Sequence, residues 1–286
     1  MLSTLLAAAI DGLMIGVVYG LVAMGLTLIF GVMNVINLAH GPVVVLGMFG
    51  VYLCFAQLGL PPYGGLLVVA VLGILLGVLI YFVAVHRVLN APHLSSLLAT
   101  FAVNMMIIGI GTSILSTNFR NVDYSLGTLR LGTIALTGTR LTAAGVALAI
   151  TAALYLFLQR TRPGKYIRAV ANNRQSAELM GIPSRRVLAL AFGIGTMLAA
   201  MAGGLLATIQ PFTILSGGVY ELKSFVIVVL GGLGNPIGAL VGGLILGLIE
   251  GLVPVFMRTT WVPVLEFVLF VLILLIRPQG LFGAKS

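Results

Sequence analysis

The stretch LLAAAIDGLMIGVVYGLVAMGLTLIF, residues 5–30, decides the class of fold, because its 26 residues include a single charged side chain, that of Asp11. About 20 consecutive apolar residues are enough to cross the hydrocarbon core of a bilayer as an α-helix. We therefore expect a membrane-spanning helix here. The residues before it carry none of the positive charge of a cleaved signal peptide, so this helix is expected to remain in the mature chain.

The composition extends this expectation to the whole chain. Hydrophobic residues make up 60% of the 286 residues and charged residues only 7%, whereas soluble domains contain about 25% charged residues. Glycine occurs 37 times, which suits membrane helices that pack closely through small residues. The chain is thus predicted to be a polytopic integral membrane protein that lies in a lipid bilayer.

Apolar runs separated by polar boundaries define the expected spans. Continuous runs of this length satisfy their backbone hydrogen bonds in lipid as helices, not as the short alternating strands of a barrel. The spans are expected near residues 5–30, 42–58, 64–85, 95–116, 141–159, 187–209, 213–231, 237–256 and 261–276. The predicted fold is an all-α transmembrane helical bundle of about 8–9 spans, formed by a single domain over residues 1–286.

The distribution of positive charge predicts which loops face the cytoplasm. Residues 160–186 contain seven of the 15 Lys and Arg residues, and cytoplasmic loops of membrane proteins carry such an excess. Counting spans from this loop places the N-terminus and the loop of residues 116–140 outside, and the C-terminus inside. Alternating apolar residues in the outer loop suggest a short hairpin. With residue 209 outside and the C-terminus inside, the number of crossings between residues 209 and 261 must be even. Two alternatives remain for residues 213–231 and 237–256: either both cross, or they form a re-entrant pair and an additional single helix crosses elsewhere.

The centre of the cytoplasmic loop carries the signals of a short capped helix. Asn173 is a suitable N-cap, because its side-chain oxygen can accept a backbone N–H, and Gly181 followed by Pro183 forms the expected stop. Ala177 and Met180, three residues apart, are expected to share one face. A helix of about two turns is unstable alone, so this face should lie against something. The alternative is a solvated connector that only supplies positive charge.

Two interrupted segments are candidates for a translocation pathway. Two Asn, one His and a Gly-Pro pair interrupt an apolar run in NVINLAHGP, residues 34–42, and four Gly, an Asn and a Pro break residues 231–238. Polar residues and broken helices at membrane depth commonly face a cavity. The alternatives are a cytoplasmic turn in the first segment, and close helix packing through Gly238, Gly242 and Gly243 in the second. The candidate pathway residues are Asn34, Asn37, His40, Thr100, Asn104, Gly231, Gly234, Asn235 and Pro236.

The other polar residues indicate no chemistry of their own. Asp11, Glu250 and Glu266 read as isolated charges, and the first two are expected to make helix-end or interhelical contacts, not a proton relay. Neither Cys54 nor His40 has the neighbouring ligands of a metal site. The net charge of +9 does not indicate a nucleic-acid partner, because no basic face is interleaved with aromatic residues. No G-x-x-x-x-G-K-[ST] motif is present, so the chain is not expected to bind ATP phosphates or to be an enzyme.

Four ordered motifs, spread over essentially the whole chain, resemble one family. They are GLTLIFGVMNVINLAHGP (residues 25–42), RAVANNRQSAELMGIPSRRVLALAFGIG (residues 168–195), VVLGGLGNPIGALVGG (residues 228–243) and RPQGLFG (residues 277–283). Together they are similar to the branched-chain amino-acid (LivH-like) permease family of ABC importers. In that family a short cytoplasmic helix is held to dock on the ATPase subunit. The resemblance implies that the ATPase-coupling residues here are Ala171, Asn173, Ser176, Ala177, Glu178, Met180 and Gly181.

The resemblance also implies a function and a set of partners. The chain would be the permease subunit of a bacterial importer in the inner membrane, translocating branched-chain or related amino acids by alternating access. It would pair with a second homologous permease subunit, two cytoplasmic ATPase subunits that bind the ATP, and a periplasmic solute-binding protein. The chain itself would bind no cofactor. The alternative is a stand-alone secondary transporter or channel for a small solute such as urea or an amide, which predicts an intramembrane ion or proton site that the sequence does not show. A membrane scaffold, the third class, would need no broken helices.

Overall fold

The computed structural model of the chain describes residues 1–89, 91–131, 134–277 and 279–283. In these residues, nine helices are long and apolar enough to cross a membrane. Each of them coincides with one of the nine predicted apolar runs, and the ends differ by only a few residues. The expected all-α, multi-pass bundle is therefore confirmed.

The helices follow one another with short connections. In chain order they are α1 (Leu2–Met33), α2 (His40–Leu58), α3 (Pro62–Ile80), α4 (His86–Val88), α5 (His93–Leu115), α6 (Gly138–Arg160), α7 (Arg162–Asn172), α8 (Arg174–Leu179), α9 (Ser184–Ala207), α10 (Gly217–Gly231), α11 (Pro236–Phe256) and α12 (Val262–Ile276). A π-helical segment, Tyr81–Val85, joins α3 to α4, so that one span continues from Pro62 to Val88. Short 3-10 turns, Ile214–Ser216 and Thr259–Trp261, precede α10 and α12.

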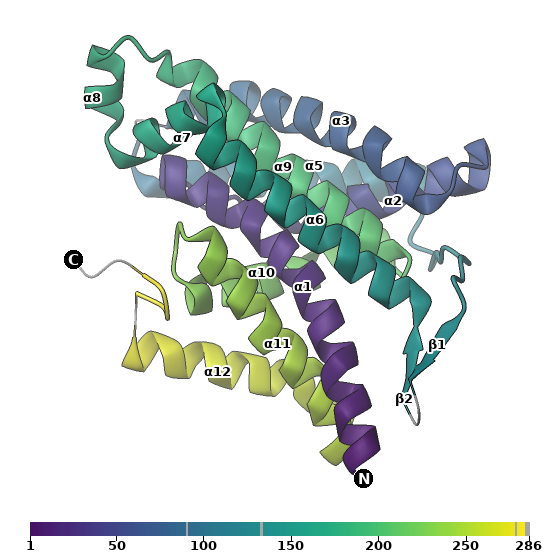
Figure 1. Cartoon of the computed structure of the whole chain (residues 1–286). Helices are drawn as coiled ribbons and strands as arrows, with labels where there is room; N and C mark the ends of the chain where they lie inside the picture. The colour runs from purple at the N-terminus through teal and green to yellow at the C-terminus, as the bar shows by residue number, and fades with distance from the viewer. Residues whose placement is uncertain (90, 132–133, 278, 284–286) are drawn as a thin grey trace.

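The two ends of the bundle carry different segments (Figure 1). One end, here called the hairpin end, carries the N-terminus and the antiparallel strands β1 (Thr128–Leu131) and β2 (Ile134–Thr137). The opposite end, here called the α8 end, carries α7, α8 and the C-terminal segment. The hairpin predicted within residues 116–140 is thus confirmed, and it lies at the opposite end from the cationic loop, as the span count requires.

Helix α1 is the centre of the bundle, and every residue from Met14 to Ile29 is buried. It packs against α9 and α11, and its contact with α11 is made by glycine. A Cβ atom built on Gly16 would lie 2.7 Å from the carbonyl oxygen of Gly243 and 3.0 Å from Cα of Leu244. Small residues let two membrane helices approach until their backbones touch, which accounts for much of the glycine content.

The interrupted segments produce two broken spans. Residues 34–39 fold back from the α8 end, and α2 begins inside the bundle, where Nε2 of His40 lies 2.9 Å from the carbonyl oxygen of Val22 in α1. From the hairpin end, where Phe212 pairs with Arg120, the chain enters the bundle again before α10 begins at Gly217. The starts of α2 and α10 then meet, since a Cβ on Gly217 would lie 3.0 Å from the nitrogen of Pro42.

This arrangement bears on the alternatives left by the sequence. Residues 34–39 form an irregular entry into α2, and Asn37 and His40 are buried within the bundle. The runs near 213–231 and 237–256 are both long and apolar enough to cross, and the first is built as an irregular entry followed by the 15-residue α10. Gly238, Gly242 and Gly243 all serve close packing, against Gly231, Ile227 and Gly20 respectively.

Candidate coupling and translocation sites

Helix α7 holds the cationic loop against the bundle. The Thr161 hydroxyl accepts a hydrogen bond from the N–H of Gly164 at 3.1 Å and so caps the helix start. Ile167 and Val170 are buried, whereas most of the other α7 side chains are exposed. The amphipathic α7 therefore fixes the base from which α8 projects beyond the bundle (Figure 1).

Both caps predicted for the short helix are present in α8. The side-chain oxygen of Asn173 accepts a hydrogen bond from the N–H of Ser176 at 2.9 Å. At the other end Gly181 has φ of 80°, and the N–H groups of Gly181 and Ile182 donate to the carbonyls of Glu178 and Ala177 at 2.9 and 3.1 Å. This pattern is a Schellman stop, which satisfies carbonyls that would otherwise lack donors.

The predicted apolar face of α8 is wrong. Ala177 is buried, with 5% of its surface exposed, whereas Met180 is 83% exposed. Met180 is the C-cap residue, with ψ of 9°, so it leaves the helical path and no longer shares a face with Ala177. Its neighbour Leu179 is 88% exposed. Ala177 therefore anchors the helix, and Leu179 with Met180 forms its outward apolar tip, here called the α8 tip.

A polar contact fixes α8 to the next helix. The Glu178 carboxylate pairs with Arg174 at 3.1 Å and accepts a hydrogen bond from the hydroxyl of Ser184, in the first turn of α9. The Ser184 hydrogen bond, followed by that of Arg174, lowers the pKa of Glu178 below its ordinary value. The charged carboxylate therefore ties α8 to the start of the α9 span.

The predicted coupling residues lie together around α8. Ala171, Asn173, Ser176, Glu178 and Gly181 are exposed, together with Met180, and of the set only Ala177 is buried. Leu179 was missed because the sequence assigned it to no face of so short a helix.

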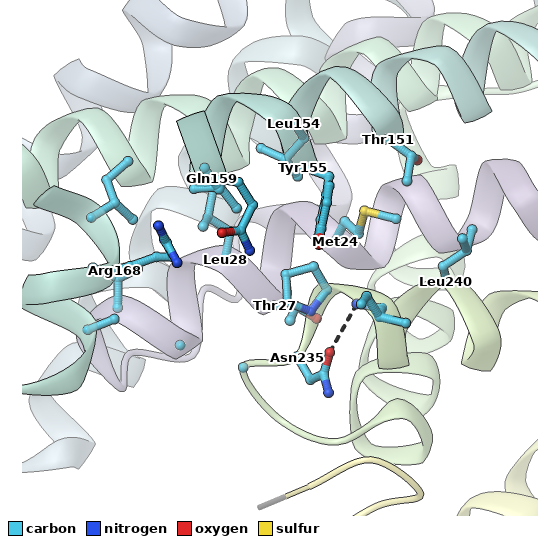
Figure 2. Close-up of a pocket in the computed structure, with 18 of the residues that line it drawn as sticks. Met24, Thr27, Leu28, Thr151, Leu154, Tyr155, Gln159, Arg168, Asn235 and Leu240 are labelled. Carbon is cyan, nitrogen blue, oxygen red and sulfur yellow. Dashed lines mark hydrogen bonds between the residues drawn. The ribbon is translucent and has the colours of Figure 1, made fainter. Parts of the chain in front are cut away.

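A pocket of about 480 Å³ lies beside α1 near the α8 end, lined by α1, α6, α7 and the start of α11 (Figure 2). Three of the predicted pathway residues, Gly234, Asn235 and Pro236, line it. Asn235 also caps α11, because its side-chain oxygen accepts the N–H groups of Ile237 at 3.0 Å and Gly238 at 3.2 Å. The buried Thr27 faces the same pocket, and its hydroxyl has no hydrogen-bond partner among the described residues.

Two other predicted pathway residues lie outside this pocket. Gly231 packs against the backbone of Gly238, and Asn34 ends α1 in the left-handed conformation, with φ of 53°. Within residues 231–236, Gly234, Asn235 and Pro236 therefore line a cavity, whereas Gly231 forms part of a closely packed turn.

Four predicted pathway residues meet in one polar junction at the broken spans. Asn37, His40, Thr100 and Asn104 are all buried. The Thr100 hydroxyl lies 3.1 Å from the Ile36 carbonyl, and Nδ2 of Asn104 donates to the Leu38 carbonyl at 2.6 Å. The Asn104 bond satisfies a carbonyl of residues 34–39 that has no helical partner, whereas the single Thr100 hydroxyl proton is shared among the carbonyls of Ile36, Ser96 and Leu97, each at 3.1 Å. Contacts from α5 therefore hold this segment inside the bundle.

The junction also contains a charged residue that sequence reasoning missed. Nδ2 of Asn104 donates to Oε2 of Glu221 in α10 at 3.0 Å. Glu221 stands inside an apolar run that the sequence identified as a span, and this could have marked it, since carboxylates within spans are uncommon.

The prediction that the intramembrane acids are isolated is wrong for Glu250 and Glu266. Nζ of Lys223, in α10, lies 2.5 Å from Oε2 of Glu250 in α11 and 3.5 Å from Oε1 of Glu266 in α12. The Tyr19 hydroxyl of α1 donates to Glu250 at 3.1 Å. This ionic cluster joins four helices, and it confirms Glu250 as an interhelical contact. Asp11 is one too, because it pairs with Arg140 of α6 at 3.3 Å.

Comparison with known proteins matches the sequence of this chain to one family. The family described as the permease component of the branched-chain amino acid transport system matches residues 8–276. The high-affinity branched-chain amino acid transport system permease proteins LivH of Salmonella typhimurium and of Escherichia coli K12 are each 32% identical, over 96% of this chain and 94% of theirs. The corresponding protein BraD of Pseudomonas aeruginosa is 28% identical over the same shares.

Proposed function

The chain belongs to the family of branched-chain amino acid transport system permease components, and from this premise we propose that it is the membrane-spanning subunit of an ABC importer for these amino acids. Its relatives are named as permease proteins of multi-component transport systems. A stand-alone transporter or channel is accordingly not favoured.

The observation that carries the coupling role is the α8 tip. A helix of six residues, capped at both ends and anchored through Ala177, presents Leu179 and Met180 outward with almost no cover. Large apolar side chains on a rigid protrusion of a membrane protein suit insertion into a groove of another protein. We assign that groove to a cytoplasmic ATPase subunit, which would place the α8 end in the cytoplasm.

Nucleotide-driven motion would reach the membrane along a short path. Glu178 links α8 to α9, and α9 packs against α1, α2 and α3. Movement of the docked ATPases would therefore bias the packing of the central helices between two states. The broken spans at the starts of α2 and α10 are the part of the bundle where such a change alters access, because they interrupt regular helix packing.

The other partners follow from the same orientation. The hairpin end would face the periplasm and receive a solute-binding protein, and a second homologous permease subunit would complete the pathway. The chain would lie in the inner membrane, and ATP would be bound only by the ATPase subunits. We propose that the pathway passes the polar junction and reaches the α8 end near Gly234, Asn235 and Pro236.

The substrate class is tested by reconstituting this chain in proteoliposomes with the second permease, the ATPases and the binding protein of the same transport system. The expected result is ATP-dependent accumulation of labelled leucine that excess isoleucine or valine competes away. Uptake of labelled urea without ATP, and none of leucine, would support the alternative function and contradict this one.

A further inference from the structure

The polar junction contains a carboxylate that the described chain leaves without a cation. Glu221 is half-buried in the α10 span, and the ion pairs of the described residues do not include it. Lys223, two residues after Glu221, is the nearest cation in the sequence. It already pairs with both Glu250 and Glu266. A charge at membrane depth that lacks a partner is costly and marks a functional site.

The orientation of Asn104 adds a second acceptor beside this carboxylate. One end of its amide lies 2.6 Å from the Leu38 carbonyl and 3.0 Å from Oε2 of Glu221. Both of these neighbours are acceptors, so this end must be the NH₂ group. The other end of the amide is its oxygen, which is buried and has no hydrogen-bond partner among the described residues.

Once the Asn104 amide has donated to Leu38 and Glu221, the two side chains have only acceptor atoms left. The carboxylate of Glu221 keeps one oxygen beyond the bond from Asn104, and Oδ1 of Asn104 adds another acceptor. A primary ammonium group has three N–H donors, no acceptor and one positive charge, and charge-assisted hydrogen bonds to a carboxylate are about twice as strong as neutral ones. An ammonium ion therefore supplies what both groups lack.

The position of the pair fits an element of the pathway. It lies where the starts of α2 and α10 meet, and a Cβ on Gly41 would come within 2.7 Å of Cβ of Glu221. Around it the single chain exposes apolar side chains, those of Phe101 and Met105 on α5 and Leu222 on α10. A carboxylate on such a face is not stable against lipid, so this face meets water or protein.

We propose that Glu221, held in position by the hydrogen bond from Asn104, receives the α-ammonium group of the amino-acid substrate as it passes the membrane. The assignment rests on the proposed function and deepens it, because it names the residue that distinguishes an amino acid from a solute without a positive charge. Apolar residues of the same face, such as Phe101, would then contact the branched side chain.

The test compares Glu221→Gln with Glu221→Asp in the complete reconstituted complex. Gln preserves the shape and can still accept from Asn104, but it removes the charge, whereas Asp keeps the charge on a shorter side chain. We expect leucine uptake per ATP hydrolysed to fall about tenfold or more in Glu221→Gln and to fall less in Glu221→Asp. Wild-type uptake in Glu221→Gln, or a larger loss in Glu221→Asp, would overturn the assignment.

Two controls distinguish a substrate site from a general sensitivity of α10 and from a contact between subunits. Leu222→Gln introduces the same amide at the neighbouring position and keeps the Glu221 carboxylate, so leucine uptake should remain near wild type. An equal loss of uptake in Leu222→Gln and Glu221→Gln would overturn the proposal. Glu221→Gln should also co-purify with the second permease at wild-type yield. Loss of that subunit would show that the carboxylate pairs with a cation of the partner and not of the substrate. Failure of the proposed function itself would appear differently, as absent leucine uptake in the wild-type complex.

Discussion

The α8 tip makes the sharpest prediction for the coupling mechanism. Replacing Leu179 and Met180 together by Asp should weaken association with the ATPase subunits, because both exposed side chains can become buried at an interface. Full burial of a large apolar side chain is worth roughly 1.5–3 kcal/mol. Half of that for each residue amounts to about 1.5–3 kcal/mol for the pair, which weakens binding roughly tenfold to a hundredfold.

The assay is co-purification of the ATPase subunits with the tagged permease in detergent, followed by titration of the purified components. Phe119→Asp is the matched control, because this side chain is 76% exposed but lies in the loop at the hairpin end, and it should leave ATPase binding unchanged. Ala177 is unsuitable for this test, since it is buried and a charge there would disturb α8 itself. Wild-type ATPase yield with the double Asp variant would refute the docking role of the tip.

Three further predictions concern the packing of the bundle and the anchoring of α8. Lys223→Met removes the cation from two largely buried carboxylates, so the bundle should lose about 3–5 kcal/mol of stability. This loss should lower the thermal midpoint of unfolding in detergent. An unchanged midpoint would argue against the ionic cluster. Gly16→Ala should cost about 1–3 kcal/mol by forcing α1 from α11, whereas Gly109→Ala, whose Cβ would meet nothing within 4 Å, should be neutral in the same assay. The lowered pKa of Glu178 means that its anchoring contribution is present at neutral pH and lost as the pH falls through that lowered value. Protection of the α8 amides from exchange, relative to their intrinsic rate at each pH, should therefore fall only in acid, and Glu178→Gln should remove this pH dependence.

The helical spans could be predicted from the sequence because the signal is local. Each span is a continuous apolar run with polar ends, and lipid leaves no alternative to a helix for such a run. The caps of α8 were predictable for the same reason, since Asn173 and Gly181 act on backbone groups within a few residues of themselves.

The features that could not be predicted depend on contacts between distant segments. The burial of Ala177 follows from where α7 and α9 hold the short helix. The partnership of Lys223 with Glu250 and Glu266 joins three helices that are remote in the chain. The polar residues of segment 34–42 are equally compatible with a cytoplasmic turn or with a segment that faces a cavity until Asn104 supplies donors from α5.

The central claim, that partner ATPases drive transport through this chain, is tested most directly by omission in proteoliposomes. Leucine uptake should require ATP, the ATPase subunits and the binding protein together, and leaving out any one of them should reduce uptake to the background of empty vesicles. Solute flux that persists with the permease subunits alone would contradict the account.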